Sequence, residues 1–124
     1  MCGIAGYKVQ RQLSPDPLDA MVQALVHRGP DGRGEYRTEG YVAGMRRLSI
    51  NDVHGGDQPL YNENRTVVLL YNGEVYNSPA LRRELEQRGH RFRTHSDGEV
   101  ICHLYEEMGE DCFSRLDGMF AAAL

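Results

Sequence analysis

Hydrophobic and polar residues change their spacing several times along the chain, and each change predicts a secondary-structure element. Residues 1–9 (MCGIAGYKV) are typical of a strand that begins at the N-terminus. Apolar side chains then recur every three or four positions over residues 18–26, as they do on one face of a helix. Ser14 as N-cap and Pro15 in the first helical position predict where this helix begins. Gly29, which is followed by proline, predicts where it ends.

The middle of the chain is expected to consist of loops and strands. Residues 28–34 and 54–62 carry Gly, Pro, Asp and Asn at the density typical of loops. Residues 40–50 are β-like with a mixed pattern, and residues 66–72 (TVVLLYN) form an apolar run that suits a strand buried on both faces. Several strands are therefore expected before the next helix.

A second helix is expected to begin at Ser78 and Pro79, because Pro favours the first helical turn. Leu81 and Leu85 would face inward, and Gly89 would end the helix.

A third helix is expected after residues 96–99 (SDGE), which match a capping box. Its inner face would consist of Val100, Ile101, Leu104, Tyr105 and Met108. Residues 118–124 (GMFAAAL) then begin another strand, within which the chain ends. Segregated strands and helices predict an α+β fold in one domain, and we expect residues 1–124 to be part of a longer unit.

Composition excludes several classes of function. The chain has 124 residues, with 14 basic against 18 acidic side chains and a net charge of −4, so it lacks the basic excess of a nucleic-acid-binding protein. It has neither an apolar run long enough for a membrane span nor a secretory signal, so we expect no membrane partner. Three cysteines without a CxxC pair predict the reducing cytoplasm and no structural zinc site.

Cys2 is the sharpest single candidate for chemistry. Removal of Met1 would leave Cys2 as the N-terminal residue, with its own α-amine beside the thiol. Because an α-amine titrates at roughly 7.7–8.0, it can accept the thiol proton as a general base. Gly3 would let a substrate approach closely. The competing interpretation is that Cys2 is a small apolar residue that begins a strand.

The Asn72-Gly73-Glu74 sequence follows the apolar run and has two interpretations. It can present an amide side chain and a backbone N–H that together stabilise a tetrahedral oxyanion. As an Asn-Gly dipeptide it is also a strong hairpin signal, and residues 72–77 would then turn and resume as a strand.

Two further positions carry charges that can serve either a ligand or the fold. Arg46 and Arg47 lie in an apolar segment and point to opposite faces of a strand, so one faces inward and needs a carboxylate from a ligand or from the protein. Asp97 lies at the start of the third helix, where it can complement the helix dipole or bind a substrate ammonium. His27 is expected to be structural, and Cys102 and Cys112 show no signal of reactivity.

Taken together, the ordered segments resemble the class II (N-terminal nucleophile) glutamine amidotransferases, and most closely the glutaminase domain of the glutamine-hydrolysing asparagine synthetases. The segments that carry the resemblance run in the family's order from one end of the chain to the other: MCGIAG, HRGPDG, RLSIND, GGDQPLYN, YNGEVYN, SDGEVI and RLDGMFAAAL. The resemblance implies a four-layer αββα sandwich with two antiparallel sheets, here as the N-terminal part of a glutamine amidotransferase type 2 domain over residues 1–124.

The resemblance also implies a role for each candidate residue in hydrolysing L-glutamine through a γ-glutamyl thioester. Cys2 would be the nucleophile, and the Asn72 side chain with the Gly73 N–H would form the oxyanion hole. Arg47 would hold the glutamine α-carboxylate bidentately, and Asp97 would hold the α-ammonium. Glu74 would line the pocket, flanked by the backbone around Leu48 and Ile50.

The same resemblance sets expectations for cofactors and partners. The glutaminase step needs no cofactor or metal, whereas ATP and Mg²⁺ would serve a synthetase domain, in cis or in trans, that makes asparagine from aspartate. The full-length form would be cytoplasmic, with a homodimer possible. Two alternatives stay open: a non-catalytic glutamine-binding or interaction module, and an amidotransferase that serves a different acceptor.

Overall fold

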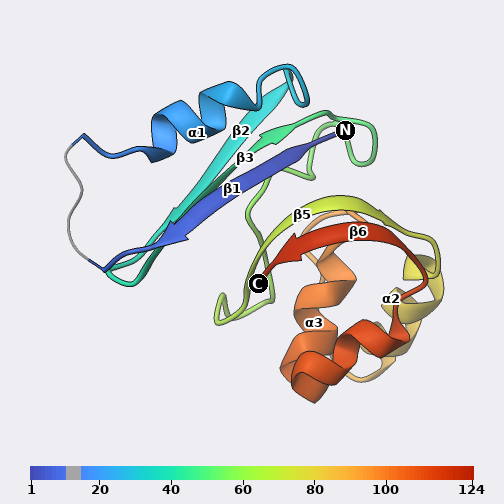
Figure 1. The fold of residues 1–124 in the computed structure, drawn as a ribbon. Helices are drawn as coiled ribbons and strands as arrows, with labels where there is room; N and C mark the ends of the chain where they lie inside the picture. Colours follow the sequence, from blue (N-terminus) through green and yellow to red (C-terminus); the bar gives the residue numbers. More distant parts are fainter. Residues whose placement is uncertain (11–14) are drawn as a thin grey trace.

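The computed structural model describes residues 1–10 and 15–124, and its elements form an α+β fold (Figure 1). In chain order they are β1 (Gly3–Lys8), α1 (Leu18–Ala24), β2 (Gly32–Arg37), β3 (Tyr41–Arg47), β4 (Leu60–Tyr61), β5 (Val68–Val75), α2 (Ser78–Gln87), α3 (Glu99–Met108), the 3₁₀ helix η1 (Gly109–Arg115) and β6 (Gly118–Ala123). The expected α+β class is confirmed. None of the helices in the described part of the chain is both long and apolar enough to cross a membrane.

The strands form two antiparallel sheets that lie between helices. One sheet has the order β1-β3-β2, and the other has the order β4-β5-β6. Helix α1 packs on the first sheet through β1 and β3, while α3 packs on the second sheet through β4 and β5. Figure 1 shows the two sheets face to face, with α1 outside one and α2 and α3 outside the other. The layers therefore follow the αββα order of the expected sandwich.

In the described part of the chain, two apolar clusters of unequal size each join one sheet to the helix layer outside it. The larger one joins β4 and β5 to the helices on their outer face, and its buried members are Leu60, Leu69, Tyr71, Val75, Leu81, Leu85, Val100, Ile101, Cys102, Leu104 and Cys112. The smaller one, beneath α1, contains Leu18, Val22 and Val42. The inward positions expected for the second and third helices are confirmed, with Tyr105 and Met108 only partly buried against this cluster. Cys112 is a core residue.

The first helix begins later than the sequence indicates. Helix α1 starts at Leu18, so Pro15 is not in its first turn, and Ser14 lies outside the described residues. The Asp16 carboxylate accepts a hydrogen bond from the Leu18 N–H at 2.8 Å, which satisfies one of the free donors at the helix start. The N-cap position itself is Pro17, which has no side chain able to cap the helix.

The Asn72-Gly73 dipeptide is not a hairpin turn. Strand β5 continues through both residues to Val75, with Asn72 opposite Ala121 and Gly73 opposite Phe120 in β6. Pairing with a strand almost fifty residues away overrides the local preference for a turn. The segment after Pro30 was likewise misassigned, because the expected loop already belongs to β2 from Gly32 onward.

The capping box expected before the third helix does not form. Helix α3 begins at Glu99, after Gly98, and no side chain caps its N-terminus. The Glu99 carboxylate instead accepts hydrogen bonds from the N–H groups of Arg93 and Thr94, each at 2.7 Å. Glu99 therefore forms hydrogen bonds with the loop before α3 and does not cap the helix.

Candidate active site

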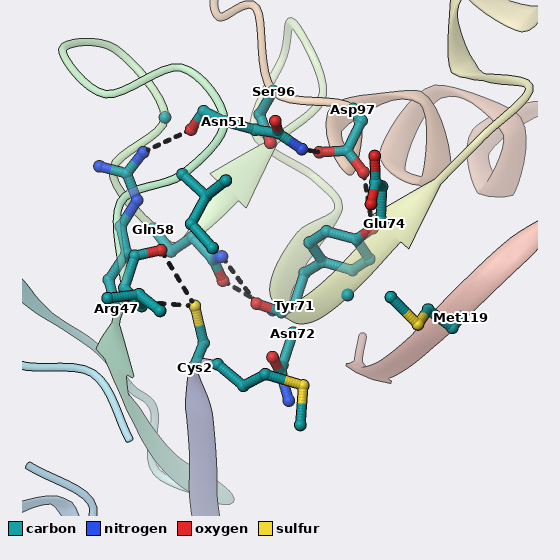
Figure 2. Close-up of a pocket in the computed structure, with 15 residues that line it drawn as sticks. Cys2, Arg47, Asn51, Gln58, Tyr71, Asn72, Glu74, Ser96, Asp97 and Met119 are labelled. Carbon is teal, nitrogen blue, oxygen red and sulfur yellow. Dashed lines mark hydrogen bonds between the residues drawn. The ribbon is translucent and has the colours of Figure 1, made fainter. Parts of the chain in front are cut away.

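A pocket of about 140 Å³ opens where the two sheets meet, and it gathers every residue that the sequence nominated for the site. This volume is well under the roughly 300–1,000 Å³ of pockets for drug-sized ligands, so the pocket suits a small solute. Figure 2 shows its lining, which includes the nominated residues Cys2, Arg47, Leu48, Ile50, Asn72, Gly73, Glu74 and Asp97. The first sheet and its following loop supply four of these residues, and β5 with the segment before α3 supplies the others.

Cys2 lies one residue before β1, and hydrogen bonds to the backbone hold its side chain in place. Its sulfur accepts the Leu48 N–H at 3.3 Å and lies 3.7 Å from the Leu48 carbonyl oxygen, to which the thiol donates. The Arg28 Nε–H donates to the Cys2 carbonyl oxygen at 3.0 Å. Met1 is 68% exposed and also lines the pocket, so the initiator residue takes up space beside the thiol.

The edge of β5 that faces away from β6 presents a backbone donor to the pocket. The Gln58 side chain pairs with Tyr71, accepting its N–H at 2.6 Å and donating to its carbonyl oxygen at 2.7 Å. The Val75 N–H donates to Asp97 at 2.7 Å. Because N–H groups alternate between the two edges of a strand, the Gly73 N–H faces the same edge as those of Tyr71 and Val75.

Gly73 is the residue type that this position requires. A Cβ atom there would lie 2.2 Å from the Met119 carbonyl oxygen and 2.5 Å from the Phe120 Cα, both in β6. Backbone atoms of a paired strand cannot move aside as a flexible side chain can. The absence of a side chain therefore lets β6 pair closely while the Gly73 N–H stays directed at the pocket.

Asp97 is anchored by three donors, two from β5 and one from the loop after β3. Its Oδ2 atom accepts the Tyr71 hydroxyl and the Val75 N–H, each at 2.7 Å, and its Oδ1 atom lies 3.4 Å from Nδ2 of Asn51. Burial, together with the hydrogen bond to Asp97, raises the pKa of Tyr71 well above its usual value, so the phenol keeps the proton that it donates. Gly98 permits this contact, since a Cβ there would lie 2.7 Å from the Tyr71 ring.

Arg47 is the inward-facing arginine of its pair, and its side chain is 6% exposed. Its Nη2 atom donates to the carbonyl oxygens of Asn51 and Asp52, at 3.0 and 2.7 Å, and its Nη1 atom donates to Asp57 at 3.0 Å. A carboxylate can bind a guanidinium bidentately through Nη1 and Nη2 or through Nε and Nη2. Both Nη2 hydrogens of Arg47 are already donated to backbone carbonyl oxygens, so neither bidentate mode is open. The protein itself therefore supplies acceptors to Arg47, through the loop after β3.

Other residues of the pocket were missed by sequence reasoning. Gln58 extends the pairing of the short strand β4 with side-chain atoms, and Tyr71 and Asn51 orient Asp97. Met119 reaches the pocket from β6. In the sequence, Tyr71 is one residue of an apolar strand and shows no sign of a polar role. Gln58 precedes a proline, and no sequence pattern identifies it as a site residue. Their roles depend on contacts between distant segments.

Comparisons with known proteins show the family to which the chain belongs. Residues 1–124 match a family model described as a glutamine amidotransferase domain. Over 127 residues, 100% of this chain, it is 46% identical to asparagine synthetase (glutamine-hydrolyzing) 3 of Arabidopsis thaliana, of which it covers 22%. It is 44% identical over 127 residues to asparagine synthetase (glutamine-hydrolyzing) of Zea mays, covering 100% of this chain and 21% of the relative. It is 43% identical over 126 residues to asparagine synthetase 1 of Bacillus subtilis (strain 168), covering 98% of this chain and 20% of the relative. The chain thus spans about a fifth of the length of these relatives.

Proposed function

The chain belongs to the glutamine amidotransferase domain family, and on this premise we propose that it hydrolyses the side-chain amide of L-glutamine to give glutamate and ammonia. One observation carries the proposal: a single small pocket holds the Cys2 thiol, the amide and N–H groups of Asn72 and Gly73, the Arg47 guanidinium and the Asp97 carboxylate. These are the groups needed to attack an amide carbon, to stabilise the resulting oxyanion and to bind an α-amino acid.

Cys2 is the proposed nucleophile once Met1 is removed. The exposed initiator residue lines the pocket, so its loss both opens space for a substrate and puts the Cys2 α-amine there. The amine takes the thiol proton as sulfur bonds to the amide carbon. The proton then passes to the leaving nitrogen, which departs as ammonia. Water hydrolyses the γ-glutamyl thioester, releasing glutamate and restoring the thiol.

The proposed oxyanion hole consists of the Asn72 side chain and the Gly73 N–H. Alternation along β5 directs this N–H away from β6, and the close approach of β6 at Gly73 fixes its position. A donor held in this way stabilises the transition state, because it needs no rearrangement when negative charge develops on the amide oxygen. Glu74 lines the same wall of the pocket.

The charged ends of glutamine are proposed to bind Asp97 and Arg47. Asp97 is held in place by its own donors and offers negative charge to the α-ammonium. At Arg47 the available position is Nη1, because its present acceptor, Asp57, has a side chain that is 88% exposed. We propose that the α-carboxylate replaces Asp57 at Nη1, a single contact rather than the bidentate pair implied by the resemblance. The backbone around Leu48 and Ile50 then flanks the substrate.

The use of the ammonia belongs to the longer protein. Relatives named asparagine synthetase (glutamine-hydrolyzing) are about five times the length of this chain, so we propose a synthetase domain, in cis or in trans, as the acceptor of ammonia. That domain would use ATP and Mg²⁺ to make asparagine from aspartate in the cytoplasm, and we propose a homodimer for the full-length form. The glutaminase step itself is proposed to need no cofactor.

A test of the glutaminase site is labelling with 6-diazo-5-oxo-norleucine, a glutamine analogue that alkylates such nucleophiles. We expect mass spectrometry to find a single adduct on Cys2 in a chain that lacks Met1, and excess glutamine to suppress the adduct. Buried Cys102 and Cys112 are internal controls that should stay unmodified. If Met1 is retained and glutamine binds without labelling, the chain is a non-catalytic glutamine-binding module instead.

A further inference from the structure

A second group of titratable side chains lies outside the candidate active site, between the β4–β5 connection and the helices. Glu63 follows β4, His90 follows α2, and His103 and Glu106 lie on α3 at a spacing that puts both on one face. One nitrogen or oxygen atom from each of the four side chains lies within 4.8 Å of the others. In particular, Nδ1 of His90 is 3.1 Å from Oε1 of Glu63, and Nδ1 of His103 is 2.9 Å from Oε2 of Glu63.

Two atoms of this cluster are buried without a hydrogen bond. His103 is 0% exposed, and neither its Nδ1 atom nor Oε2 of Glu63 makes a hydrogen bond with any residue in ranges 1–10 and 15–124. The 2.9 Å contact between them lacks hydrogen-bond geometry, so proximity does not satisfy either atom. A buried polar atom without a partner is costly, and both of these atoms face the centre of the cluster.

The outer nitrogen of each histidine faces a further carboxylate. Nε2 of His103 lies 3.4 Å from Oε1 of Glu99, and Nε2 of His90 lies 3.2 Å from Oε1 of Glu107. A neutral imidazole carries one proton. Among the described residues, His103 has hydrogen-bond geometry to a carboxylate only at Nε2, which favours the proton there and leaves the Nδ1 lone pair facing Oε2 of Glu63, itself an acceptor. His90 has a carboxylate oxygen at hydrogen-bond distance from each ring nitrogen, so its Nδ1 can bind a cation when the proton lies on Nε2. A cation between the two unpartnered atoms, Nδ1 of His103 and Oε2 of Glu63, would satisfy both.

We infer that Glu63, His90, His103 and Glu106 bind a single Zn²⁺ ion. Two imidazole nitrogens and two carboxylate oxygens are a ligand set that zinc accepts in tetrahedral geometry. With metal–ligand distances of roughly 2.0–2.2 Å, the ligands of such a site are about 3.4 Å apart, which the cluster reaches with small movements. Carboxylates behind both histidines are the outer partners that fix ring orientation in zinc sites.

Glu106 completes the site from its solvent-facing side. Its residue is exposed, which gives an ion a path of entry, and its carboxylate is oriented by Nδ2 of Asn62 at 2.9 Å. Four protein ligands leave no open position for a substrate, so the ion is structural. It fastens the β4–β5 connection and the segment after α2 to the middle of α3. No CxxC or similar spacing marks these positions, which explains why the sequence alone predicted no zinc site.

The experiment is a zinc titration of the chain after dialysis against a chelator, in a Cys2→Ser background that removes the thiol of the other site. We expect one equivalent of Zn²⁺ to bind by calorimetry and to raise the midpoint of thermal unfolding. Co²⁺ should replace it and give the visible absorption of tetrahedral nitrogen and oxygen ligation, without a thiolate charge-transfer band. The band's absence separates this site from binding by a cysteine.

Matched variants decide whether the bound ion occupies these four ligands. Glu107→Gln removes only an outer partner and should weaken zinc affinity about 10–100-fold, and Glu106→Gln, which removes an exposed ligand, should weaken it further. Glu110→Gln makes the same change of charge at an exposed carboxylate next to the end of α3 and should leave affinity unchanged.

Four results would overturn the inference. The first is a chain with folded circular dichroism that takes up no zinc, and the second is equal zinc affinity in Glu106→Gln and Glu110→Gln. The third is a nuclear magnetic resonance spectrum in which both histidines stay doubly protonated with zinc present, since two added protons would then supply the cation. A chain that stays unfolded in excess zinc also counts against a stabilising ion.

Discussion

The two halves of the sandwich differ in packing, and the candidate active site draws on both. Among residues 1–10 and 15–124, the half with α1 and the β1-β3-β2 sheet has a buried cluster of three residues, whereas the half with α2, α3 and the β4-β5-β6 sheet has a buried cluster of eleven. The lightly packed half holds the proposed nucleophile. The densely packed half holds the proposed oxyanion hole and Asp97.

This difference shows two ways to hold a functional group. The Cys2 thiol is positioned by hydrogen bonds to the backbone of Leu48, at the ends of strands. Asp97 is positioned by Tyr71, whose ring is packed in the larger core. The first arrangement depends on strand register, and the second depends on core packing. Mutations in the two halves should therefore affect the site by different routes.

The largest effect expected is that of Cys2→Ala, which removes the proposed nucleophile. Glutamine hydrolysis should fall to background, a loss on the order of 10⁶-fold in kcat, because no other group in the pocket can form the thioester. Glutamine binding and the free energy of unfolding should change little. Turnover is measured as ammonia release, and glutamine binding is measured by calorimetry. Wild-type turnover in this variant would refute the assignment.

The packing contrast itself is tested by Leu104→Ala and Leu18→Ala, two truncations of leucines that are at most 1% exposed. Leu104→Ala should reduce the free energy of unfolding by about 3–5 kcal/mol, because its dense surroundings cannot collapse into the space. Leu18→Ala, beneath a short helix, should cost about 2–3 kcal/mol, because α1 can settle toward the sheet.

Urea unfolding of the two leucine variants gives both free energies from one measurement. Equal losses would mean that the smaller cluster is as rigid as the larger one. The comparison between the halves would then concern only the number of buried residues, not how firmly each half holds its part of the site.

Asn72→Ala tests a catalytic group in the densely packed half. Loss of one oxyanion donor should lower kcat by about 10²–10³-fold, with little change in KM, because the interaction forms mainly in the transition state. Steady-state kinetics with glutamine separates the two parameters. A rise in KM at unchanged kcat would show that Asn72 binds the ground state and is no part of an oxyanion hole.

The sequence predicted elements well where the local pattern and the tertiary environment agree. The strand at residues 3–8 and the helix at residues 78–87 carry clear periodicity and end signals, and both are confirmed. Strand β2 was missed because Gly32 and Gly34 read as loop residues. A Cβ at Gly34 would lie 2.1 Å from the Gln58 carbonyl oxygen, so tight packing, not a turn, explains that glycine.

The candidate site came mainly from the resemblance, and its supporting contacts came only from the structure. Position alone left Cys2 open to a purely structural interpretation, and it left Asn72-Gly73 open to interpretation as a hairpin turn. Long-range pairing with β6 decides the conformation of Asn72-Gly73, and no local pattern encodes it. The partners of Arg47 were equally hidden, because a buried arginine in a strand can be satisfied by a ligand or by the protein.

The smallest expected effect concerns the exchange proposed at Arg47, and it tests whether the two halves cooperate in binding glutamine. Asp57→Asn removes the charge that competes for Nη1, so KM for glutamine should fall, by up to about fivefold, with kcat unchanged. An ion pair with so exposed a carboxylate is worth at most about 1 kcal/mol, which limits the change. Arg47→Ala is the matched comparison and should raise KM, since it removes the charge that faces the substrate carboxylate. If Asp57→Asn also raises KM, then Asp57 orients Arg47 instead of competing with glutamine, and the α-carboxylate must bind elsewhere on the guanidinium.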